Sequence, residues 1–71
     1  MKYYFSIHLS YREFLPYYQG QIYAIVATTD KGIRVQFPAS HLREYVTNEG
    51  IHGYFCMNTE NNKFLSLTKI A

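Results

Sequence analysis

The feature that most constrains the fold is a strict alternation of side chains near the start of the chain. Between Tyr3 and Leu9 every second residue is apolar or aromatic, and Ser6 and His8 occupy positions between them. A period of two residues is typical of a β-strand that buries one face. This run therefore predicts a half-buried strand and favours a strand-rich domain.

Four more strands are predicted from runs rich in β-branched and aromatic residues, at residues 21–28, 33–37, 51–58 and 63–70. The first of these runs has apolar residues on both faces, which predicts a central strand covered on both sides.

Side-chain directions follow from the same alternation. Arg34 and Gln36 alternate with apolar residues and should face outward. The residues expected to face inward on the last two strands are Phe55, Met57, Leu65 and Leu67. The residues between these two strands, 59–62, include two asparagines that can adopt the left-handed conformation of a hairpin loop.

Two short helices are expected between the strands. Ser10 and Glu13 have the spacing of a capping box, so a helical turn should begin at Tyr11. Pro16 cannot donate to the Arg12 carbonyl, and the helix should therefore end by Leu15 or kink there.

The second helix should follow Pro38, which ends a strand and suits an early helical position. Leu42, Tyr45 and Val46 form one apolar stripe and predict a helix that covers an open end of the core. Gly53 indicates a bulge or a close backbone approach in the strand that comes next.

These elements predict one all-β domain over residues 1–71. Five short strands, with one helix between strands 1 and 2 and one between strands 3 and 4, match a small OB-like barrel, and an SH3-like barrel is the alternative. A closed barrel is favoured because an open sheet of this size would leave unpaired strand edges and expose much of an aromatic core.

The composition indicates a cytoplasmic protein. Cys56 is the only cysteine, so no internal disulfide can form. The longest apolar run, Ile22–Ala27, has six residues, whereas a membrane-spanning helix needs about 20. A net charge of +2 permits anionic partners but does not require them.

Several segments resemble a family of short uncharacterised bacterial proteins, DUF2835. The resemblance covers nearly the whole chain and is most specific in its proline-alanine and glycine-isoleucine stretches. It implies a bacterial source and no particular activity. The segments that carry it are Tyr17-Tyr18-Gln19-Gly20, Val35-Gln36-Phe37-Pro38-Ala39, His41-Leu42-Arg43 and Glu49-Gly50-Ile51-His52-Gly53-Tyr54-Phe55.

The sequence does not predict an enzyme, a metal site or a cofactor. Cys56 lies between two apolar residues of a strand, without the motifs that surround catalytic cysteines. The three histidines have unrelated spacings that do not match metal-binding motifs. We therefore expect no catalytic residues, no metal ligands and no cofactor.

The best candidates for binding are basic and aromatic. Arginine can contact phosphates and tyrosine can stack on bases, so these residues could form one rim that binds single-stranded nucleic acid. The alternative is a solvated surface in which the arginines pair with nearby glutamates. The candidate residues are Arg34, His41, Arg43, His52 and Tyr54.

A protein-interaction or adaptor module, including one that self-associates, is the leading prediction. So small a core cannot bury every tyrosine, and tyrosine is enriched at protein interfaces. The tyrosines concerned are Tyr4, Tyr11, Tyr17, Tyr18 and Tyr23. Nucleic-acid binding is the alternative function, and no membrane partner is expected.

Overall fold

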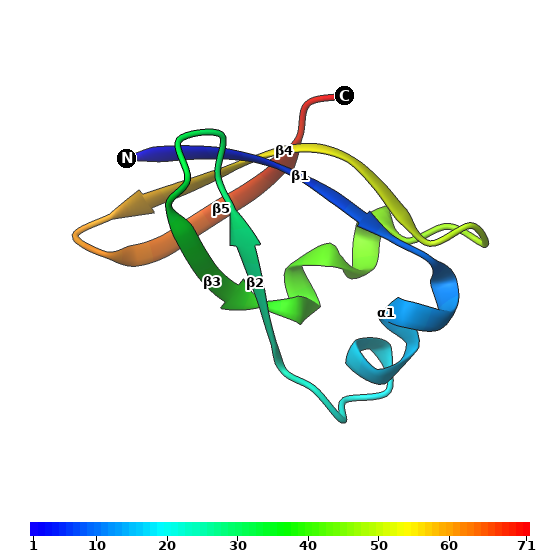
Figure 1. Ribbon diagram of the computed structural model, residues 1–71. Helices are drawn as coiled ribbons and strands as arrows, with labels where there is room; N and C mark the ends of the chain where they lie inside the picture. The colour runs from blue at the N-terminus through cyan, green and yellow to red at the C-terminus, as the bar shows by residue number, and fades with distance from the viewer.

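The computed structural model describes residues 1–71 and is built mainly of strands (Figure 1). It confirms five strands and two short helices in the predicted order. In chain order the elements are β1 Lys2–Leu9, α1 Tyr11–Tyr18, β2 Ala24–Thr28, β3 Arg34–Pro38, η1 Ala39–Tyr45, β4 Ile51–Glu60 and β5 Lys63–Lys69.

The strands form two antiparallel sheets and no closed barrel is found. One sheet has the order β1-β4-β5, and the other is the β2-β3 hairpin. A backbone hydrogen bond of 2.9 Å joins them, donated by the Asp30 N–H to the Tyr4 carbonyl. The coarse expectation of a small β-rich domain is confirmed, and the finer expectation of a barrel is not.

Aromatic side chains hold the two sheets together. Phe5 of β1 stacks with Phe55 of the adjacent strand, at 6.4 Å between ring centroids, and with Phe37 of the hairpin, at 5.6 Å. Phe14 of α1 and Leu42 of η1 are also buried in this core, at 1% and 0% exposure. Both helices therefore help to close the core that the two sheets leave open.

The capping box at the start of α1 is confirmed in both directions. The Glu13 N–H donates to the Ser10 Oγ at 3.1 Å, and the Ser10 N–H donates to the Glu13 Oε1 at 3.0 Å. The hydrogen bonds to Ser10 hold the pKa of Glu13 below its usual value. The helix continues through Pro16 to Tyr18, so of the two predicted outcomes the end at Leu15 does not occur.

The second helix, η1, is a 3₁₀ helix that begins directly after Pro38. Leu42 is fully buried, while Tyr45 and Val46 are half-buried against the core. The prediction of a helix that covers the core is thus confirmed. Figure 1 shows η1 and α1 at the end of the molecule where β1 finishes.

Two predictions about strand faces are wrong. Leu65 is 52% exposed because the β4-β5 register shifts between Asn58 and Thr59, which changes the phase of the alternation on β5. β2 begins only at Ala24, and Val26 is 48% exposed, because β2 lies in a two-stranded sheet that is covered on one face.

Three other local predictions are confirmed. Arg34 and Gln36 are exposed, as expected. Asn61 and Asn62 have φ values of 53° and 64° and form the hairpin loop. A Cβ at Gly53 would lie 2.8 Å from the Ala71 carbonyl oxygen, which confirms a close backbone approach there.

Candidate binding site

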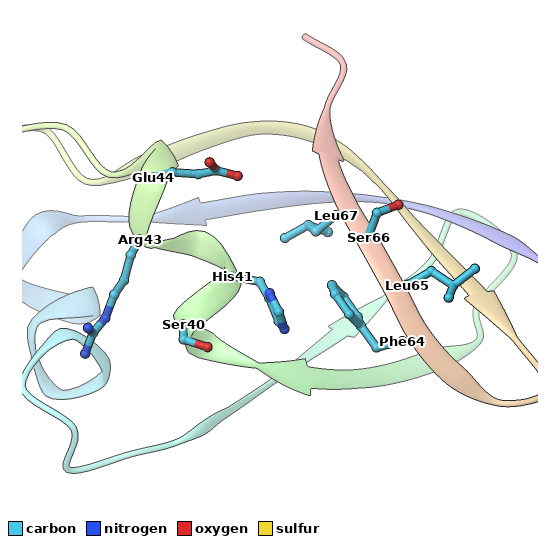
Figure 2. A pocket seen from close by; sticks show the side chains of 8 residues that line it. All are labelled: Ser40, His41, Arg43, Glu44, Phe64, Leu65, Ser66 and Leu67. Atoms are coloured by element: carbon cyan, nitrogen blue, oxygen red, sulfur yellow. The ribbon is translucent and has the colours of Figure 1, made fainter.

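A cavity of about 480 Å³ lies between η1 and β5 (Figure 2). We call this the η1–β5 groove. Residues of η1 line one side and residues of β5 line the other, where the Phe64 and Leu67 side chains point toward η1 (Figure 2). The lining residues are Ser40, His41, Arg43, Glu44, Phe64, Leu65, Ser66 and Leu67.

An aromatic pair connects the two sides of the groove. The ring of His41 stacks on the ring of Phe64 with 4.0 Å between centroids and 18° between planes. Both side chains are half-buried, and Figure 2 shows their rings next to each other between η1 and β5. The groove therefore contains a flat aromatic surface that stays partly accessible to a ligand.

The backbone of β5 is open on the side that faces the groove. β5 pairs with β4 alone, and the Ile70 N–H donates to the Tyr54 carbonyl of that strand at 2.7 Å. No strand pairs with the other edge of β5, which lies on the side of the groove. This edge of the sheet therefore remains open to an added strand.

Tyr45 covers the next part of this edge. Its hydroxyl donates to the Leu67 carbonyl at 3.0 Å, which confirms that this carbonyl faces away from β4. Burial raises the pKa of Tyr45, and the negative charge of neighbouring Glu44 adds to that effect. The phenol therefore stays protonated and keeps its hydrogen bond to β5.

Arg43 has a structural contact that the sequence did not indicate. Its Nη2 donates to the Tyr18 carbonyl at 3.0 Å, and its guanidinium lies 5.3 Å from the centre of the Tyr18 ring. The last turn of α1 has no basic residue of its own. In Figure 2 the Arg43 side chain points away from Phe64. Its positive charge therefore lies at the C-terminal end of α1, where it stabilises the helix.

His52 and Tyr54 lie on the outer face of the β1-β4-β5 sheet. The His52 ring lies 5.7 Å from the ring of His8, which is directly opposite on β1. The His52 Nε2 is 2.9 Å from the Glu49 carbonyl oxygen. His52 therefore belongs to an exposed aromatic pair that spans two strands.

Tyr54 forms a second such pair with Tyr4, with 6.1 Å between ring centroids. Its hydroxyl donates to the Asp30 carboxylate. This hydrogen bond, together with desolvation and the negative charge of Asp30, raises the pKa of Tyr54 to about 12. A carboxylate thus lies beside this aromatic pair.

The five residues predicted from the sequence fall into three places. His41 and Arg43 line the groove together, His52 and Tyr54 share the outer sheet face, and Arg34 is exposed at the start of β3, opposite Thr28. No hydrogen bond or aromatic contact joins Arg34 to the other four.

Sequence reasoning missed the β5 side of the groove. Phe64 and Ser66 were not singled out, and Leu65 was assigned to the core. The only available signal was the exposed pair of asparagines before β5, which gives the hairpin but not the shifted register.

The structure also bears on three other candidate chemistries. No group of three or more histidine, cysteine, aspartate or glutamate side chains is placed to hold a metal ion. Cys56 is a half-buried free thiol. No helix has both the length and the apolar character needed to cross a membrane.

Comparison with known proteins gives a family but no function. Neither the curated proteins nor the solved structures include a match to this chain. A family model described as a protein of unknown function (DUF2835) matches residues 1–70. Because that match covers essentially the whole chain, the protein belongs to the DUF2835 family.

Proposed function

We propose that this chain is a non-catalytic protein-interaction module of the bacterial cytoplasm. In this proposal the η1–β5 groove receives an extended segment of a partner protein, which adds to the open edge of β5. The observation that carries the proposal is the edge of β5 that pairs with no other strand, beside a cavity of about 480 Å³. Strand addition of this kind is a recurring mode of peptide recognition.

The side chains of the groove suit such a segment. Main-chain hydrogen bonds to β5 would supply affinity, and the surface formed by His41 and Phe64 would receive apolar side chains. Ser40, Ser66 and Glu44 provide polar groups at its rim.

The surface composition agrees with an interaction module. Of the five tyrosines that so small a core was not expected to bury completely, Tyr4, Tyr11, Tyr18 and Tyr23 are exposed by 39% to 79%, and Tyr17 is half-buried. Tyrosine is enriched at protein interfaces because it offers apolar area and a hydrogen-bonding tip.

We also propose that this fold is related to small OB-like or SH3-like barrels. Its support is the strand count, the position of η1 between β3 and β4, and the Asp30–Tyr4 backbone bond between the two sheets. A partner strand beside β5 would extend the β1-β4-β5 sheet and cover its exposed edge.

Single-stranded nucleic-acid binding is the second candidate. The Tyr4–Tyr54 and His8–His52 pairs on the outer face offer rings for base stacking. Two observations weigh against it: Arg43 is engaged with α1, and Asp30 places a negative charge beside Tyr54. A protein partner is therefore the better-supported proposal.

A pair of matched variants tests the main proposal. Leu65→Lys adds a charge at the groove, and Val26→Lys adds the same charge at a position of similar exposure on the other sheet, 48% against 52%. Affinity capture from a bacterial lysate should recover a partner with the wild type and Val26→Lys but not with Leu65→Lys. The partner segment, made as a synthetic peptide, should shift the NMR signals of β5 and η1. Equal capture by both variants, or shifts confined to other elements, would refute the groove.

The nucleic-acid candidate is tested by its dependence on salt. A fluorescent single-stranded oligonucleotide should bind more weakly as salt increases, and replacing Arg34 and Arg43 with alanine should reduce that dependence. Binding that is absent at low salt eliminates this candidate and leaves the groove proposal unaffected.

A further inference from the structure

We propose that the His8–His52 pair on the outer face of the β1-β4-β5 sheet binds a divalent transition-metal ion. One ring nitrogen of each histidine would be a protein ligand, and water would fill the other positions of the ion. Imidazole suits ions such as Zn²⁺ and Ni²⁺, whereas Mg²⁺ and Ca²⁺ prefer oxygen ligands. Neither histidine lines the η1–β5 groove, so this site does not depend on the function proposed for the groove.

The register of β1 and β4 brings the two histidines together. His8 is directly opposite His52 in the antiparallel pairing, and directly opposite residues have Cβ atoms about 4.5–5.5 Å apart. Both side chains are exposed, so an ion can reach them from solvent. The unrelated spacings of the histidines along the chain predicted no metal ligands, but the strand register pairs two histidines that are far apart in the sequence.

The distance between the two rings suits one shared ion. Their centroids are 5.7 Å apart and their planes are inclined by 35°. With metal–nitrogen bonds of about 2.0–2.1 Å, two imidazoles on one ion have centroids about 4.5–6.4 Å apart, depending on the angle at the metal. The observed distance lies within this range, so no backbone movement is needed to bring both rings onto one ion.

A hydrogen bond prepares His52 as a ligand. Its Nε2 is 2.9 Å from the Glu49 carbonyl oxygen. Because a carbonyl oxygen only accepts, Nε2 carries the proton of the neutral ring, and Nδ1 keeps the lone pair that a metal ion needs. Metal-binding histidines commonly donate their other ring N–H to a backbone carbonyl, which fixes the tautomer and the ring orientation. The His8 ring contacts His52 and takes part in no side-chain hydrogen bond, so it has a nitrogen free to bind.

The surroundings of the pair favour a cation that exchanges readily. The Glu13 carboxylate interacts electrostatically with His52, and its hydrogen bonds to Ser10 lower its pKa and keep it ionised. No third histidine, cysteine or carboxylate completes a set of three ligands. Two protein ligands are fewer than the three that hold a catalytic zinc ion, so the ion should bind reversibly and exchange with solvent.

Titration with Ni²⁺ tests the site, in a Cys56→Ser background that removes the competing thiol. Calorimetry should give one ion per chain, and His8→Ala and His52→Ala should each abolish the binding. Both side chains are exposed, so these variants should remain folded by circular dichroism. His41→Ala is the control, because His41 stacks on Phe64 with no histidine beside it, and it should leave Ni²⁺ binding unchanged. Zn²⁺ should shift the NMR signals of the His8 and His52 rings together, and Mg²⁺ should shift neither.

Thermal unfolding gives an independent measurement. The pair exists only in the folded chain, because the register of β1 and β4 forms it, so Zn²⁺ should raise the midpoint of unfolding. Neither His8→Ala nor His52→Ala should show this increase. If the two histidines bound ions separately, each single variant would keep one of the two ions, and that result would overturn the inference. An absence of Ni²⁺ binding, or an equal loss of binding through His41→Ala, would also overturn it.

Discussion

Gly50 is the position where an added methyl group should damage this fold most. It is buried, its φ is +101°, and it closes the loop after η1 through hydrogen bonds with Thr47 of 2.8 and 2.9 Å. A Cβ at this position would lie against the Leu9 carbonyl oxygen, 2.5 Å from the Ser10 carbonyl carbon and 2.6 Å from the Tyr11 nitrogen. All three are backbone atoms at the junction of β1 and α1, so they cannot move as a flexible side chain would.

The cost of Gly50→Ala has two parts. A left-handed backbone costs a non-glycine residue roughly 1–2 kcal/mol, and overpacking of a rigid site adds about 1–3 kcal/mol or more. The sum is about 2–5 kcal/mol, comparable to the roughly 3–5 kcal/mol that one small core supplies. Gly50→Ala should therefore be largely unfolded.

Gly20→Ala is the matched control, because Gly20 has a φ of +81° and no atom within 4 Å of the added Cβ. Its free energy of unfolding should fall only by the roughly 1–2 kcal/mol that a left-handed backbone costs alanine. Urea denaturation followed by circular dichroism gives both free energies of unfolding. Equal losses of stability in the two variants would refute the claim that the close approach of the 47–50 loop to the β1–α1 junction adds to the cost of Gly50→Ala.

Three further predictions concern side-chain contacts. Arg43→Ala should lower the free energy of unfolding by about 1 kcal/mol, measured by urea denaturation, because the last turn of α1 loses its contact at the Tyr18 carbonyl; an unchanged stability would contradict that role. Ser10→Ala should cost about 1 kcal/mol, measured in the same way, through loss of the cap of α1. The folded state holds the pKa of Tyr54 at about 12, above the roughly 10 of an unfolded tyrosine. The stability contributed by the bond to Asp30 is thus complete below about pH 10 and lost as the pH rises through about 12; thermal unfolding across this range should show the loss in the wild type and a smaller loss in Tyr54→Phe.

Local signals in the sequence predicted the elements well. The capping box of Ser10 and Glu13 needs only residues three apart, and both of its hydrogen bonds form. Pro38 ends β3 and precedes η1 because its ring fixes φ and removes a donor, whatever the rest of the chain does. Elements defined by such short-range chemistry can be read from one sequence.

The candidate site depended on contacts that no local pattern contains. Arg43 seemed available for a ligand, but its partner is Tyr18, 25 residues away. Tyr54 meets Asp30, 24 residues away, and that contact places a carboxylate where a nucleic-acid surface would need positive charge. Predicting a shared rim required the relative placement of β3, η1 and β4, which only the packed fold supplies.

The irregular register of β5 explains both the missed residue and the function proposed for it. A bulge usually protects an edge strand, as do charges at its ends. Here Lys63 and Lys69 flank the strand and Tyr45 covers its later part, yet the register shift turns Leu65 outward at the uncovered part. The edge of β5 beside the cavity is therefore less protected than its ends, which is consistent with the proposed strand addition. The groove is therefore the first place to look for the activity of this protein.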